Sequence, residues 1–251
     1  MKLKSHIIIF MTLFIINLFL VGATVFEESS HGGSRTVPDK VKFKSAQKEE
    51  ALVIKTNKAS GTVKLEINLN DSNGKPVNFE LKAKTDPNNP RKIKYKYRDE
   101  DDDKATFVAV KYPDANKEDA KDSFKIFLER NGQESLVCKV KFGDGKMKIG
   151  SDEELTTPTY EIKNQTERKK KKYVEKLKVY HKGNYIASVS KSKESGKYKV
   201  KRILGVEEEK EDLYSTKDLN YMSYSIGVLG IEVMDPRLRA VIVAEILKKE
   251  K

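Results

Sequence analysis

The C-terminal segment VMDPRLRAVIVAEILKKEK constrains the fold more than any other part of the chain. Asp235 is a good N-cap residue, and Pro236 suits the first helical position, where its missing N–H costs nothing. Beyond Pro236, apolar side chains cover most of the circumference of a helix and are interrupted by Arg239 and Glu245. Because a surface helix carries only one apolar stripe, we expect other elements to enclose this helix.

Short runs of alternating apolar and polar residues follow one another from about Val41 onward, and this alternation predicts half-buried β-strands. The run TVKLEINLN places Val63, Leu65, Ile67 and Leu69 on one face, and the Asn-Gly pair that follows it predicts a tight hairpin turn. About a dozen such runs are present, which is typical of a sandwich or a barrel. We interpret Tyr221–Leu229 as the last strand and Glu207–Asp218 as an acidic insert that is partly helical.

The strands and the terminal helix together predict the fold. A closed sheet of about twelve strands is too wide for its own side chains to fill. The helix would be about 22 Å long, and burying its aliphatic side chains would contribute on the order of 10 kcal/mol before entropy is counted. We therefore predict a mostly β protein: a closed antiparallel β-barrel of about twelve strands around a buried apolar C-terminal helix. A β-sandwich with a C-terminal helix is the alternative. The residues expected to fill the centre are Leu238, Val241, Ile242 and Ile246.

The N-terminal end predicts secretion. Lys2 and Lys4 precede an apolar run that ends in small residues, the pattern of a signal peptide cut after Ala23. We therefore expect residues 1–23 to be a signal peptide, 24–40 a flexible leader, and 41–251 a single β domain. An uncleaved signal anchor in a membrane is the alternative.

Charge and cysteine content bear on the partners. The net charge of +12 falls by only two when Lys2 and Lys4 are removed, so the mature chain favours anionic partners. Secretion argues against nucleic acid among them, and leaves lipid headgroups, glycans or an acidic protein receptor. The single cysteine, Cys138, alternates with apolar residues and is interpreted as a buried strand residue. Asn70 and Asn164 begin N-glycosylation sequons that we expect at turns or strand ends.

The sequence contains no recognisable catalytic motif. The three histidines, His6, His31 and His181, are scattered, and neither a phosphate loop nor a nucleophile motif is present. We therefore expect no enzyme, no catalytic residue and no cofactor. The acidic run RDEDDDK could supply calcium ligands from Asp99, Asp101 and Asp103, although a solvated loop is the simpler interpretation.

The strongest basic cluster lies in ERKKKKYVEKLK. Lysines close to an anionic membrane surface contribute about 1 kcal/mol each, so the cluster could hold the protein to lipid headgroups. A solvated hairpin that keeps the protein soluble is the alternative. The candidate lipid-binding residues are Arg168, Lys169, Lys170, Lys171 and Lys172.

Three segments resemble the tubby C-terminal-like superfamily, which includes tubby proteins, phospholipid scramblases and LURP-one-related proteins. YSIGVLGIEVMDPRLRAVIVAEIL (Tyr224–Leu247) is similar to their ending, where a last strand leads through an acidic residue into a buried helix. GNYIASVSKSKESGKYKV (Gly183–Val200) and NDSNGKPVNFELKAK (Asn70–Lys84) resemble a later strand pair and an early hairpin of these proteins.

The resemblance implies a twelve-stranded barrel threaded by the C-terminal helix. It also implies lipid binding through basic side chains on the barrel wall, as tubby domains bind phosphoinositides. With the signal peptide, it predicts a secreted, non-enzymatic protein, such as a secreted effector, that binds an anionic membrane surface or a protein partner. A scramblase-like lipid-handling protein, which would need membrane insertion and calcium, is the alternative.

Overall fold

The computed structural model describes residues 37–57, 60, 62–97, 106–111, 123–130, 132–152, 155–169, 172–205 and 208–250. The predicted signal peptide and nearly all of the predicted leader lie outside these residues. The described part contains fourteen strands and two helices. The helices are α2 (Tyr224–Leu229) and α3 (Pro236–Lys249). The strands are β1 (Lys40–Ser45), β2 (Glu50–Asn57), β3 (Thr62–Asn70), β4 (Pro76–Asp86), β5 (Asn89–Tyr97), β6 (Thr106–Lys111), β7 (Ser123–Arg130), β8 (Gln133–Gly143), β9 (Lys146–Gly150), β10 (Tyr160–Lys169), β11 (Lys172–His181), β12 (Asn184–Lys191), β13 (Tyr198–Leu204) and β14 (Glu209–Thr216).

The strands form one antiparallel sheet in which each strand pairs with the next along the chain. The first and last strands also meet, but only through the pairs Lys44–Ser215 and Ser45–Tyr214. The sheet is therefore strongly curved, and its two edges touch at one end. The mostly β, antiparallel prediction is confirmed. The two-sheet sandwich is wrong, because a single sheet contains every described strand.

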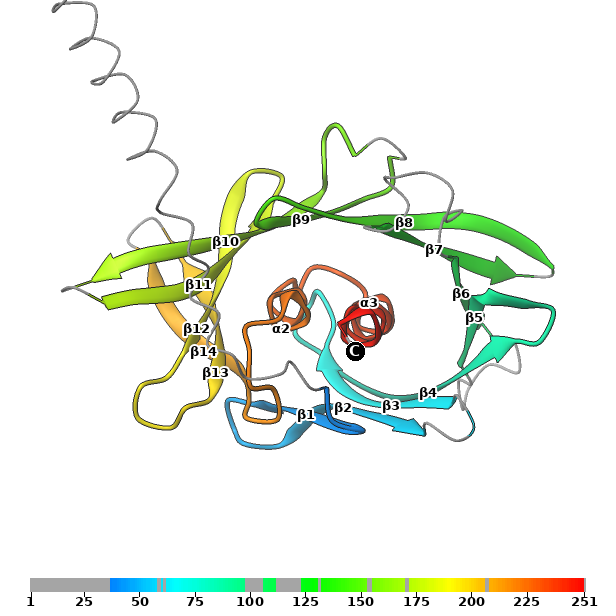
Figure 1. The fold of residues 1–251 in the computed structure, drawn as a ribbon, viewed down its shortest axis with the longest axis horizontal. Coiled ribbons are helices and arrows are strands. Elements are labelled where there is room, and N and C mark those ends of the chain that lie inside the picture. The colour runs from blue at the N-terminus through cyan, green and yellow to red at the C-terminus, as the bar shows by residue number, and fades with distance from the viewer. Residues whose placement is uncertain are drawn as a thin grey trace, which may run out of the picture. The chain divides into compact units, whose positions relative to one another are not determined.

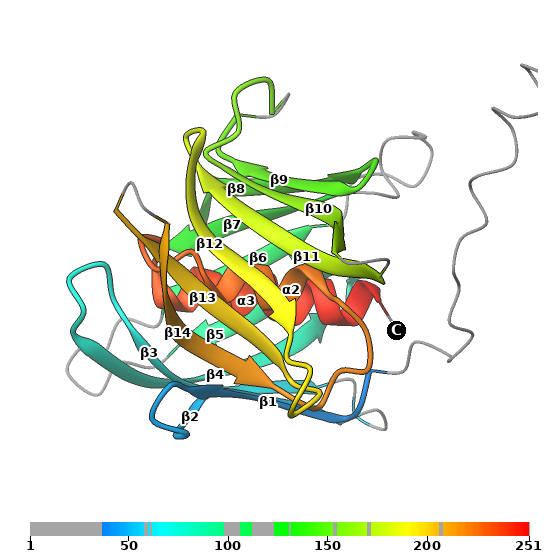
Figure 2. The same ribbon diagram turned by 90° about the vertical axis from the view of Figure 1, so that its left-hand side faces the viewer.

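Both helices lie inside the curve of the sheet (Figure 1). Helix α3 packs against α2 and β3, whereas α2 packs against β10–β13. A second view shows α3 running behind β10–β13 (Figure 2). Val241, Ile242 and Ile246 are fully buried and Leu238 is half-buried against the same core, so the predicted enclosure of this helix is confirmed.

The start of α3 is the one the sequence predicts. The carboxylate of Asp235 accepts hydrogen bonds from the backbone N–H groups of Arg237 and Leu238 at 2.8 and 3.2 Å. These bonds satisfy two of the donors that a helix N-terminus leaves without partners.

The two charged residues in the middle of α3 are also buried and are held by other elements. The Tyr95 hydroxyl donates to Glu245 Oε1 at 2.6 Å. The Arg239 guanidinium donates to the backbone oxygens of Asn70 and Leu229 at 2.7 and 3.3 Å. Because a buried charge is costly without such partners, these contacts favour one position of the helix inside the sheet.

Two sequence predictions near the C-terminus are wrong. Tyr221–Leu229 was predicted as the last strand, but its second half forms α2, which begins where Ser223 Oγ accepts from the Ser225 N–H at 3.0 Å. Glu207–Asp218 was predicted as a partly helical insert, but it contains strand β14. Asp212 bonds Lys199 and Lys201 on β13 at 2.8 and 3.0 Å, which matches the acidic strand to a basic neighbour. The described residues contain fourteen strands, where the sequence predicts about twelve.

Cys138 lies on β8 and faces the core, as predicted. Burial raises the pKa of its thiol to about 12, so the sulfur stays protonated and unreactive in the folded protein. The two sequon asparagines are both exposed. Asn70 ends β3, as predicted, whereas Asn164 lies within β10 and not at a strand end.

Candidate functional site

The predicted basic cluster lies at the end of one long hairpin. Arg168 and Lys169 are the last two residues of β10. Lys172 begins β11, and its backbone pairs with that of Lys169. Lys170 and Lys171 lie outside the described residues. The backbone thus places Arg168, Lys169 and Lys172 where β10 ends and β11 begins.

A row of lysines that sequence reasoning missed crosses this hairpin and the neighbouring strand β9. Lys163 on β10 lies directly opposite Lys178 on β11 and, on its other side, directly opposite Lys146 on β9. All three side chains are exposed or half-buried. The three ammonium groups therefore belong to residues that are cross-strand neighbours on three adjacent strands.

Two tyrosines extend this row into a mixed surface. Tyr180 and Tyr185 are paired across β11 and β12, with ring centroids 5.7 Å apart. Lys163 Nζ lies 5.0 Å from the centroid of Tyr180, and Lys178 Nζ lies 5.4 Å from that of Tyr185. These distances are those of cation–π contacts. We call Lys146, Lys163, Lys178, Tyr180 and Tyr185 the lysine–tyrosine surface.

The charge of this surface is only partly balanced. Glu161 bonds Lys163 at 2.8 Å, and this hydrogen bond raises the pKa of Lys163. Like charges directly opposite each other destabilise a sheet, so the Lys146–Lys163–Lys178 row has an electrostatic cost in the free protein. An anion at this surface would remove that cost.

Lysines on another part of the wall are matched to acids more closely. Lys64 lies 3.2 Å from Glu66 and 2.7 Å from Glu80, and these hydrogen bonds raise its pKa. Lys94 bonds Glu129 at 2.8 Å. Lys64 also lies directly opposite two lysines, Lys55 and Lys82, so its two glutamate partners and not its register distinguish it from the row on β9–β11.

His181 ends β11 and stacks on Tyr160, with ring centroids 4.9 Å apart. Burial, helped by Lys182, lowers the pKa of its imidazole, which is therefore neutral at pH 7. It is the one histidine among the described residues. The arrangement thus supplies no pair of imidazoles for acid–base chemistry there.

The predicted calcium ligands Asp99, Asp101 and Asp103 lie outside the described residues. Within the part of the chain that the structure describes, no group of three or more metal-ligating side chains is present. In the same part, no helix has the length and apolar character needed to cross a membrane.

Comparisons with protein-family models, with curated proteins and with solved structures found no match to this chain. The resemblance to the tubby C-terminal-like superfamily therefore stays a prediction.

Proposed function

We propose that this chain is a secreted, non-enzymatic protein of tubby and LURP-one-related type, whose curved sheet is a closed barrel and whose lysine–tyrosine surface binds an anionic membrane. The single observation that carries the proposal is the row Lys146–Lys163–Lys178 beside the two tyrosine rings. It adds positive charge to the strands that also carry the predicted basic cluster.

The chemistry of this surface suits a layer of lipid headgroups. Lysines near an anionic membrane contribute about 1 kcal/mol each, so three of them favour the bound state by roughly 3 kcal/mol. Tyr180 has an apolar ring and a polar hydroxyl, and such side chains are favoured where a membrane meets water, whereas the hydroxyl of Tyr185 is buried. Two of the adjacent strands, β10 and β11, also carry the predicted basic cluster, which would add further charges.

Sedimentation with phosphatidylserine-containing vesicles tests this proposal. We expect the full chain to bind at low salt and to be released as ionic strength rises from about 0.1 M to about 1 M, where the screening length falls from about 10 Å to about 3 Å. The double variant Lys146→Gln/Lys178→Gln should bind about thirtyfold more weakly, because two contributions of about 1 kcal/mol are lost.

The matched control is Lys82→Gln/Lys84→Gln, which makes the same charge change at two exposed lysines of β4. It should bind vesicles almost as the unmodified chain does. Equal losses in both double variants would show that net charge, and not this surface, drives binding. Failure to bind the vesicles at low salt would overturn the membrane proposal and leave a protein receptor as the partner to seek.

A further inference from the structure

A pocket opens in the sheet where β1 ends. Beyond Ser45 the chain turns back into β2, so β1 and β14 pair only at Lys44–Ser215 and Ser45–Tyr214. The β3–β4 hairpin forms the opposite side, and the space between has a volume of about 510 Å³. That size is within the range of small-molecule sites, and the pocket is distinct from the lysine–tyrosine surface on β9–β12.

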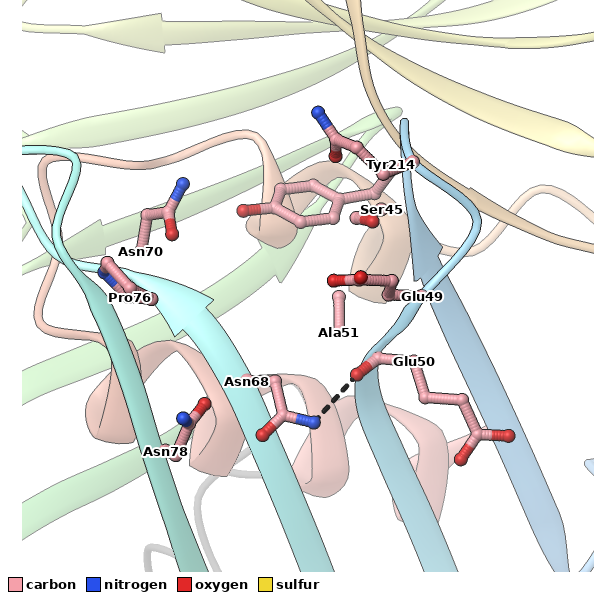
Figure 3. Close-up of a pocket in the computed structure, with 10 residues that line it drawn as sticks. Ser45, Glu49, Glu50, Ala51, Asn68, Asn70, Pro76, Asn78 and Tyr214 are labelled. Atoms are coloured by element: carbon pink, nitrogen blue, oxygen red, sulfur yellow. Dashed lines mark hydrogen bonds between the residues drawn. The ribbon is translucent and has the colours of Figure 1, made fainter.

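The side chains around this pocket are polar and come from both sides (Figure 3). Tyr214 on β14 points its ring across the opening toward Asn70 on β3, and Glu49 reaches in from the β1–β2 turn. Asn68 and Asn78 complete the lower part of the opening. Asn68 is held in place because its side-chain N–H donates to the backbone oxygen of Glu50 at 2.9 Å.

A buried arginine connects the two sides of this pocket. The guanidinium of Arg239, which does not line the pocket, donates to the backbone oxygen of Asn70 on one side of the opening. Arg239 also interacts with Tyr214, on the other side of the opening. A pocket of this size between two connected walls can hold a small polar partner.

The composition of the lining selects the class of that partner. Among the described residues that line the pocket, none is lysine or arginine, and Glu49 brings a carboxylate, so an anion is disfavoured. Asparagine amides both donate and accept, and a carboxylate accepts. A ligand with several hydroxyl groups on a ring can satisfy all of these at once.

We propose that this pocket binds a sugar, either a free saccharide or one end of a glycan. The hydroxyl groups of the sugar can accept from the asparagine amides and donate to Glu49. The proposal does not depend on the membrane-binding proposal, because the two sites use different strands.

The sugar could come from outside or from the chain itself. Asn70 is at the rim of the pocket and begins the sequon Asn70-Asp71-Ser72, so a glycan on its amide would stand beside the opening. Ser72 is exposed in the following turn. Ser72→Ala removes the sequon and keeps Asn70, which separates the two sources.

The first experiment uses the full chain produced in bacteria without N-glycans. Backbone amide signals are followed by NMR during titration with glucose, galactose, mannose and N-acetylglucosamine. We expect at least one of these sugars to shift signals of the pocket residues alone. Glu49→Gln/Asn78→Ala should weaken that binding about tenfold or more, because two hydrogen-bonding groups are lost. The matched control Glu194→Gln/Asn184→Ala changes exposed residues elsewhere and should bind normally.

The second experiment compares the chain from a secretory host with its Ser72→Ala variant. Binding by the variant alone means that the chain's own glycan occupies the pocket, whereas equal binding by both means that the ligand is external. Either result supports a sugar site. Two results overturn the proposal: none of the four sugars shifts the pocket signals, or the pocket double variant binds as tightly as the unmodified chain.

Discussion

Ile242→Asp is expected to abolish the stable fold. Ile242 is fully buried in α3, among aliphatic side chains from the sheet. Placing a carboxylate there costs several kcal/mol whether it stays charged or takes up a proton. Since a domain of this kind is stable by only about 5–15 kcal/mol, most of that margin is lost. Urea unfolding followed by circular dichroism measures the effect.

Val233→Asp is the matched control, because it makes the same change at a residue that is 50% exposed just before the helix. Its free energy of unfolding should change by less than about 0.5 kcal/mol. An Ile242→Asp protein as stable as the control would show that α3 is not enclosed.

Gly230→Ala is expected to lower the free energy of unfolding markedly, although it adds only one methyl group. Gly230 ends α2, and a Cβ atom there would lie 2.7 Å from Cβ of Ala187 and 3.1 Å from Cγ1 of Val200. Its backbone is ordinary, with φ at −73°, so the cost comes from contact and not from backbone strain. Overpacking a close contact of this kind costs about 1–3 kcal/mol, which thermal or urea unfolding detects.

Gly143→Ala provides the comparison, because an added Cβ there meets nothing within 4 Å. This variant should be as stable as the unmodified protein. If both variants unfold at the same urea concentration, α2 does not press against β12 and β13 as described.

The terminal helix was predictable because its signals are local. Asp235 and Pro236 mark its start, and the apolar circumference beyond them requires enclosure. Alternating runs such as Thr62–Asn70 were predictable for the same reason, since one buried face leaves a period of two in the sequence.

The elements that sequence reasoning missed depend on contacts with distant residues. YSIGVL alternates like a strand, but its glycine and the following Gly230 let a short helix approach β10–β13 closely. The acidic run of β14 resembles a loop until the opposing Lys199 and Lys201 are known. Local propensity is overridden in both places by tertiary contacts.

The candidate site was predictable only in part. The lysine run at 168–172 is visible in the sequence, but the row Lys146–Lys163–Lys178 arises from the register of three strands. The pocket at Ser45 arises because β1 ends before the strand that it pairs with. Register and strand length are set by the whole sheet, and a one-residue slip would change both.

Hydrogen exchange of the α3 backbone amides tests most directly whether the sheet encloses this helix. If it does, amides from Val241 to Leu247 exchange as slowly as those of the central strands β11 and β12, and only through unfolding of the whole domain. Exchange of these amides far ahead of β11 and β12 would mean that the helix opens by itself, which contradicts the enclosure.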